Sequence, residues 1–235
     1  IDVLSYAIKA EKGDIFQKDV LLLIDELTDN SWQTPYSSRV ESITNHQYTK
    51  VNGDDIDIGD FITDIDSLNE EDLTKLKSLA LKEDNVVHFI LSENAKASLV
   101  NIYLEMPEDE NFSGPMEFAE KQQEYFKEKY PDIFVGIAGT VQYAHNFQTT
   151  AERDGQTMYP IFIILIFVLS YILLRSVLAS VITLFVIILS ILPSMGSAGW
   201  FGFDVNPPLI IAPIIILTIA LAHSIHIISI AMTNM

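Results

Sequence analysis

The sequence has no cysteine among its 235 residues, which excludes disulfide bridges and metal sites built on thiolates. Basic residues are scarce as well, with 14 Lys and Arg against 32 Asp and Glu and a net charge of −18. A surface this acidic repels the phosphates of nucleic acids and disfavours simple electrostatic docking on anionic lipid headgroups. We therefore expect a solvated acidic surface and no nucleic-acid partner.

Familiar catalytic motifs are also missing. The sequence contains no nucleophile elbow, Walker loop, GxGxxG or HExxH pattern. Aspartates 54, 55, 57 and 60 cluster within seven residues, but a calcium loop counted from Asp55 would need Gly at its sixth position and Glu at its twelfth. Those positions hold Asp60 and Asp66. We predict that the protein is not an enzyme and holds no metal or cofactor.

Charge disappears almost completely from the C-terminal third of the chain. From residue 156 onward the only charged residues are Arg175 and Asp204. Three apolar segments occupy residues 158–174, 177–200 and 207–232. A helix needs about 20 apolar residues to cross a bilayer. The sequence thus predicts an acidic extracytoplasmic domain over residues 1–155 and a bundle of transmembrane helices over residues 156–235.

The one basic residue in a short membrane loop predicts the orientation. Basic loops stay on the cytoplasmic side, so the turn at Arg175 should be cytoplasmic. Residues 1–155 and the polar turn at 202–206 then lie on the opposite face, which is the periplasm of a Gram-negative bacterium. The predicted location is the bacterial inner membrane, with several passes. A start at Ile1 without a signal peptide indicates an internal part of a longer protein.

Apolar periodicity in the acidic domain alternates between strands and helices. Predicted strands cover residues 3–10, 39–44, 86–91, 97–104 and 133–137. Predicted helices cover residues 16–28, a segment that begins at Ser67 with Glu70 in a capping box, and residues 115–130. Residues 52–60 are predicted as an acidic loop, and Gly139 should begin the descent into the membrane. The order β-α-β-α-β-β-α-β indicates an α+β domain with a ferredoxin-like split βαβ core.

Two histidines interrupt the third apolar segment. His223 and His226 are three residues apart, which places them on one helical face. They could be neutral imidazoles bonded to neighbouring helices. Ionisable groups at membrane depth are costly, however, and commonly carry ions or protons, and an imidazole titrates near neutrality. We favour a proton relay at this pair.

Two further possibilities concern the surroundings of the histidine pair. Ser224 and Ser229 could extend a polar track, or they could simply bond carbonyls of the preceding turn. A metal ion shared by the two imidazoles would need ligands from other helices, so we rank a metal site lower.

Several local patterns carry a family resemblance. Residues 42–45 with 53–56 resemble a strand and acidic loop, residues 131–139 resemble a domain exit, and residues 222–226 resemble a motif on the fourth membrane helix. In this order they resemble the resistance-nodulation-division (RND) superfamily of transporters, and most closely its MMPL-like, hydrophobe/amphiphile exporter branch. Many members have Ala-Asp-Ser-Ile-His where this chain has Ala-His-Ser-Ile-His, so His223 stands in the place of an aspartate.

The resemblance implies a proton-motive-force-driven exporter of hydrophobic or amphiphilic, lipid-like molecules. The proton gradient would take the place of any cofactor, and the acidic domain would be a porter domain. Expected partners are the lipid bilayer, the substrate, the missing half of the same polypeptide and further copies in a homo-oligomer. A SecD/SecF-type protein-translocation accessory and a sterol-sensing-type lipid-binding protein are the alternatives. Because a loaded histidine is positive where a loaded aspartate is neutral, proton coupling through His223 is a hypothesis of its own.

Overall fold

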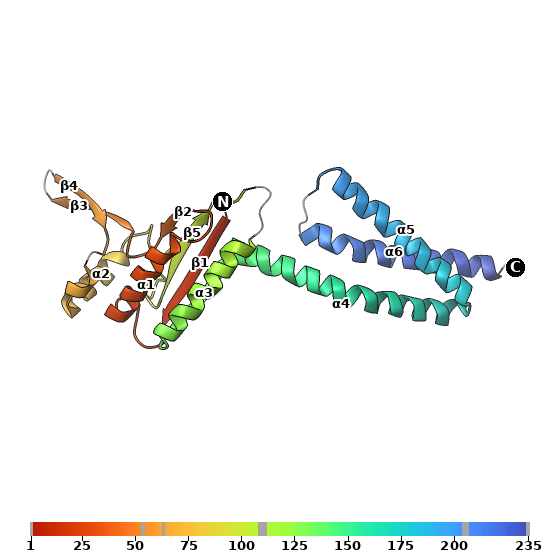
Figure 1. Cartoon of the computed structure of the whole chain (residues 1–235), viewed down its shortest axis with the longest axis horizontal. Coiled ribbons are helices and arrows are strands. Elements are labelled where there is room, and N and C mark those ends of the chain that lie inside the picture. Colours follow the sequence, from red (N-terminus) through yellow and green to blue (C-terminus); the bar gives the residue numbers. More distant parts are fainter. Residues whose placement is uncertain (1, 53–54, 63, 108–111, 204–206, 234–235) are drawn as a thin grey trace. The chain divides into compact units, whose positions relative to one another are not determined.

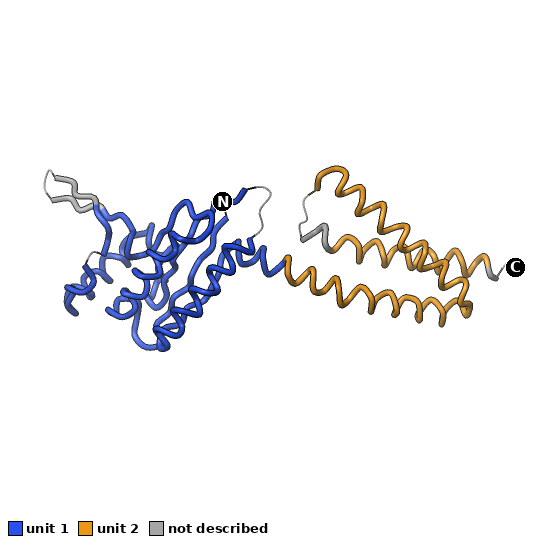
Figure 2. The backbone as a smooth tube through the Cα atoms, viewed as in Figure 1, with its two compact units in different colours: residues 1–147 blue, residues 148–235 orange. Residues whose placement is uncertain are grey.

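The structure is a computed structural model that describes residues 2–52, 55–62, 64–107, 112–203 and 207–233. The chain forms two compact units, Ile1–Phe147 and Gln148–Met235 (Figure 2). The first is a mixed α/β unit with an antiparallel sheet, and the second consists of apolar helices. This confirms the predicted order of regions, a mixed α/β region followed by three helices that can cross a membrane.

The first unit is built on a four-stranded sheet with the strand order β2-β5-β1-β6 (Figure 1). Its strands are β1 (Asp2–Ala10), β2 (Ser37–Glu41), β5 (Ala97–Leu104) and β6 (Ile133–Gly139). All neighbouring strands are antiparallel, and in the central strand Tyr6 pairs with Val100 on one side and Ile137 on the other. The strand predicted at residues 97–104 is confirmed at both ends.

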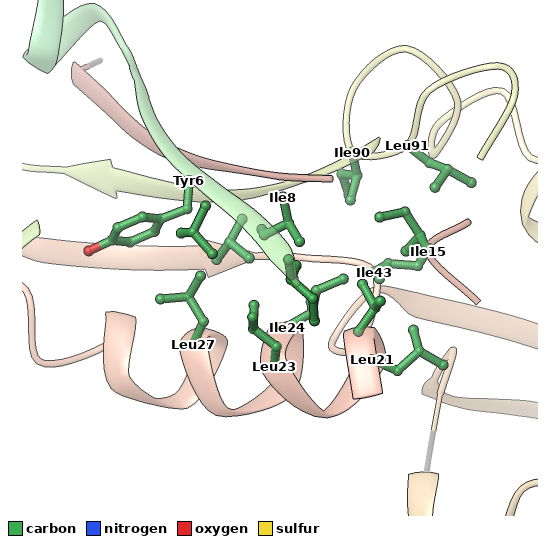
Figure 3. Packing of buried hydrophobic residues seen from close by; sticks show 14 of the residues in the cluster. Tyr6, Ile8, Ile15, Leu21, Leu23, Ile24, Leu27, Ile43, Ile90 and Leu91 are labelled. Atoms are coloured by element: carbon green, nitrogen blue, oxygen red, sulfur yellow. The ribbon is translucent and has the colours of Figure 1, made fainter. Parts of the chain in front are cut away.

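Helices α1 (Lys18–Ser31) and α3 (Ser113–Lys129) contact the sheet and each other. Every second residue of β1 is fully buried, namely Leu4, Tyr6 and Ile8. Leucines 23 and 27 of α1, spaced one helical turn apart, point toward this face (Figure 3). Burying each such side chain contributes about 1.5–3 kcal/mol. The alternation in the strand and the turn spacing in the helix therefore build one shared core.

The acidic segment at residues 52–60 is not a loop, and that prediction was wrong. Strands β3 (Gln47–Asn52) and β4 (Asp55–Asp60) pair with each other in a separate two-stranded hairpin. In the sequence Ile56 and Ile58 alternate with aspartates, a period of two with β-branched residues that favours a strand. Asp54 lies outside the described residues.

The strand predicted at residues 86–91 is also wrong. This segment is a series of turns with two isolated bridges, and Val86, Ile90 and Leu91 point into the core. The adjacent residues Ile90 and Leu91 are both buried, whereas a strand would send them to opposite faces. The N–H groups of Ile90 and Leu91 both donate to the Val86 carbonyl at 2.9 Å, so the backbone is curled. His88, with φ of 73°, breaks the extended path.

Helix α2 (Glu70–Ala80) begins later than predicted. Ser67 ends a short 3₁₀ turn, η1 (Ile65–Ser67), and is not the cap. Asn69 caps α2 instead, because its side chain accepts hydrogen bonds from the backbone N–H groups of Glu71 and Asp72 at 2.9 and 3.1 Å. The Asp72 carboxylate accepts from the Asn69 N–H at 3.3 Å, which completes a capping box.

The second strand of the sheet also ends earlier than predicted. Residues 42–45 form a turn in which the Asn45 side chain accepts from the Ser42 N–H at 2.8 Å. Side chains of this kind compete with strand pairing, so β2 stops at Glu41.

The helical unit contains most of α4 (Thr140–Leu174), together with α5 (Val177–Trp200) and α6 (Pro207–Thr233). Each includes a stretch long and apolar enough to cross a membrane. The turn between α4 and α5 forms because Arg175 has a positive φ of 50° and Ser176 caps α5. Helices α5 and α6 pack against each other. Of the polar turn predicted before α6, positions 204–206 lie outside the described residues.

Candidate functional site

The candidate site lies on α6, the most uniformly apolar helix of the chain. It starts at Pro207, where proline is tolerated because the first-turn N–H groups have no helical partner. Residues Ile211–Ala231 form its membrane-capable stretch of 21 residues, about 31 Å at 1.5 Å per residue. No charged residue occurs between positions 207 and 233, so the two imidazoles are its only ionisable groups.

The two histidines lie together on the outer side of the described helices. His223 and His226 are both exposed, whereas Ser224 is 6 % exposed and faces the interior of the unit. Ser229, three residues after His226, is exposed on the histidine side. We call His223 and His226 the histidine pair. Packing thus separates Ser224 from it and leaves Ser229 beside it.

Sequence reasoning missed three buried hydroxyl groups in the neighbouring helices. Ser170 of α4 and Ser180 and Thr183 of α5 are completely buried. Ser180 and Thr183 share one helix face with Ala179 and Ile187, which are also buried. The spacing of this polar stripe was a usable signal, because small and hydroxyl-bearing residues are enriched where membrane helices meet.

The described residues contain no group of three His, Asp or Glu side chains that could hold a metal ion. In the first unit, His88 lies 3.6 Å from the Glu93 carboxylate, and both side chains are largely exposed. The preference for a proton relay over a metal site at the histidine pair therefore stays a prediction.

An ion pair joins α1 to α3 in the first unit. The Lys129 ammonium donates to both carboxylate oxygens of Glu26 at 2.7 Å, and it lies over the rings of Tyr125 and Tyr130. The hydrogen bond to Glu26 raises the pKa of Lys129 to about 12. Partial burial works to raise the pKa of Glu26, but the lysine outweighs it, and that pKa ends below its ordinary value. The Lys129 ammonium is therefore engaged by Glu26 and links α3 to α1.

An antiparallel α/β unit joined to three membrane-capable helices defines a multi-pass membrane protein. A model of the MMPL family matches residues 25–226, from α1 to the second histidine of the pair. The chain therefore belongs to the MMPL family, and it is an RND/MMPL-like transporter sequence. No curated protein matches the chain. The predicted resemblance to this family is confirmed.

Proposed function

We propose that the protein exports hydrophobic or amphiphilic, lipid-like molecules and is driven by the proton gradient. The observation that carries this proposal is the histidine pair on the outer side of α6, within the matched family region. An ionisable group facing hydrocarbon is costly, so such a face is normally covered by protein or lines a water-filled path. A covered, hydrated histidine pair can load a proton on one side of the membrane and release it on the other.

In this proposal His223 is the primary proton carrier and His226 assists it. A loaded imidazole is positive and an empty one is neutral, so loading changes the charge of the α6 surface at membrane depth. That change can bias two arrangements of the helices, and α4 offers a mechanical link because it continues from β6 of the first unit into the helical unit. The gradient would thus act on the first unit through α4.

We also propose that the first unit is a porter domain with a ferredoxin-like split βαβ core. The support is the antiparallel strand order β2-β5-β1-β6, with α1 following β1 and α3 following β5. In that scheme the hairpin β3–β4 and helix α2 are an insertion between the second and third core strands. We place residues 1–155 in the periplasm of a bacterial inner-membrane protein, because Arg175 favours a cytoplasmic α4–α5 turn.

The partners in this proposal follow from the exposed surfaces. The apolar sides of α4, α5 and α6 contact the bilayer, and the histidine pair is covered by the rest of the same polypeptide or by another copy in a homo-oligomer. No nucleic acid is expected, given the acidic first unit. The family match favours the exporter over the SecD/SecF-type and sterol-sensing-type alternatives.

Export from sealed vesicles tests this proposal. The full-length protein is reconstituted with a fluorescent amphiphile, and a pH gradient of either sign is imposed. We expect amphiphile movement to follow the sign of the gradient and to stop when a protonophore removes it. Amphiphile binding that is unaffected by the gradient, with no net movement, would instead support the sterol-sensing-type alternative. Copurification with translocon subunits would support the SecD/SecF-type one.

A further inference from the structure

The helical unit contains a second polar feature, separate from the histidine pair. Four hydroxyl side chains of its helices are buried: Ser170 of α4, Ser180 and Thr183 of α5, and Ser224 of α6. The first three are 0 % exposed and Ser224 is 6 % exposed. Most other residues of these helices are apolar and many are exposed. Each of the three helices thus has at least one buried hydroxyl group, whereas other hydroxyl side chains, such as Ser194 and Thr218, are exposed.

Helix geometry places these hydroxyls at similar depth. Thr183 lies 17 residues before the end of α5 at Trp200, and Ser224 lies 17 residues after the start of α6 at Pro207. Because α5 and α6 run in opposite directions and pack together, equal counts from their shared turn give equal depth (Figure 1).

A similar count applies at the turn between α4 and α5, where only Arg175 and Ser176 separate the two helices. Ser170 lies four residues before the end of α4 at Leu174, and Ser180 lies three residues after the start of α5 at Val177. Thr183 is one helical turn beyond Ser180 on the same face. All four hydroxyls therefore lie toward the end of the unit where Arg175 forms the turn.

Their hydrogen bonding is incomplete. The Ser180 Oγ donates to the Ser176 carbonyl at 2.9 Å, and the Thr183 Oγ1 donates to the Ala179 carbonyl at 3.0 Å. Each of these oxygens keeps lone pairs that can accept. The Ser170 Oγ is buried and has no hydrogen-bond partner among the described residues. Buried hydroxyls are nearly always bonded to protein or to ordered water.

We propose that Ser170, Ser180, Thr183 and Ser224 form an internal water-binding site, here called the hydroxyl site. A buried water makes two to four hydrogen bonds with otherwise unsatisfied groups, and this cluster offers one free donor and several acceptors. The hydroxyl site reaches the backbone of His223 through Ser224, its neighbour in the sequence, although packing turns the two side chains to different faces of α6. Its use as a path for protons between the Arg175 side and His223 rests on the proposed function; the presence of water does not.

Cysteine reactivity in the full-length protein tests the hydroxyl site. Residues 1–235 contain no cysteine, and any cysteine elsewhere in the polypeptide is first replaced by serine. A thiol reacts as its thiolate, which needs water around it. The variants are Ser170→Cys and Thr183→Cys, with Leu169→Cys and Val181→Cys as controls. The controls are neighbours at nearly the same depth whose side chains are 43 % and 50 % exposed on the outside of the described helices. The probe is a small charged methanethiosulfonate added to sealed proteoliposomes.

We expect the two hydroxyl-site cysteines to react about tenfold faster than the controls, the ratio that one unit of thiol pKa would give. Equal or slower reaction than the controls would overturn the proposal. Radical footprinting of the unsubstituted protein gives an independent result, since water near Thr183 should lead to oxidation of buried Ile187 and spare the more exposed Ile188. Oxidation of the more exposed Ile188 but not of buried Ile187 would also overturn the proposal.

Proton flux separates this proposal from the proposed function. Fast cysteine reaction together with proton flux that survives His223→Asn supports the hydroxyl site and contradicts the role of the histidines. Flux that requires His223 while the cysteines stay unreactive contradicts the hydroxyl site and supports the histidines. If protons use the hydroxyl site, Ser170→Ala should slow flux and Ser170→Thr, which keeps the hydroxyl, should restore it.

Discussion

The junction between the sheet and the first membrane helix depends on Gly139, and the substitution Gly139→Ala should destabilise the first unit strongly. Gly139 has φ of +105°, and a Cβ built there would lie 2.3 Å from the Val3 carbonyl oxygen and 3.2 Å from the Ser5 nitrogen. These are backbone atoms of the central strand, which pairs on both sides. The strand cannot move without disturbing the sheet.

Two costs add for this substitution. A non-glycine residue in a disfavoured backbone conformation costs about 1–3 kcal/mol. Forcing an extra methyl group into a packed region costs about 1–3 kcal/mol more. We therefore expect Gly139→Ala to lower the free energy of unfolding by about 2–6 kcal/mol.

Gly136→Ala is the matched control in the same strand. A Cβ at Gly136 would meet the ring of Phe134 at 2.9 Å, but that ring is 55 % exposed and can swing aside. We expect a loss of less than about 1 kcal/mol.

The assay is urea unfolding of residues 1–147, the first compact unit, followed by circular dichroism. With a slope of about 2 kcal/mol per molar urea, Gly139→Ala should lower the midpoint by about 1–3 M, while Gly136→Ala should scarcely change it. Equal midpoints for the two variants would refute the assigned backbone conflict. The slope should stay the same, because an altered slope would mean that the substitution changes the unfolded ensemble.

Three further predictions concern the same unit and use the same unfolding assay. Tyr6→Phe should leave stability unchanged or raise it by about 1 kcal/mol, because the buried Tyr6 hydroxyl has no partner among the described residues and burial raises its pKa; a large loss would reveal a bond to that hydroxyl. Asn69→Ala should lower the free energy of unfolding by about 1 kcal/mol, because the cap of α2 is lost. Asn69→Asp can still cap the helix and should retain most of that stability. Lys129→Met should destabilise the first unit at neutral pH, and this loss of stability should disappear in acid. The reason is that the folded pKa of Glu26 is lowered by the lysine, so this contribution is present above the ordinary glutamate pKa and disappears as pH falls through the folded value; a pH-independent difference would contradict it.

The sequence was most informative where apolar spacing was unambiguous. The run at residues 97–104 alternates across a buried strand, and the uncharged segments at 177–200 and 207–232 are long helices, so these bounds came out almost unchanged. Predictions failed where short polar residues decide the backbone. Asn69 competes with Ser67 for the cap of α2, and only the packing of the preceding turn settles which one is used.

The strand predicted at residues 86–91 failed for another reason. A short apolar run fits a buried strand and a curled turn equally well, and contacts with the core distinguish the two. For the candidate site, the spacing of three already places both histidines on one face of α6. Which face meets the other helices could not be predicted, because α6 is apolar on all sides and its orientation depends on α5. The burial of Ser224 on the opposite side comes from that packing.

Proton flux through the full-length protein tests the central claim most directly. The measurement is pH change inside sealed proteoliposomes on addition of an amphiphilic substrate, compared for the unsubstituted protein and for His223→Asn, His226→Asn and His88→Asn. The last variant makes the same chemical change at an exposed histidine of the first unit, and asparagine tolerates the positive φ there. We predict that His223→Asn abolishes substrate-linked proton flux, that His226→Asn reduces it, and that His88→Asn leaves it intact. Undiminished flux in His223→Asn would contradict the claim that this histidine carries the proton.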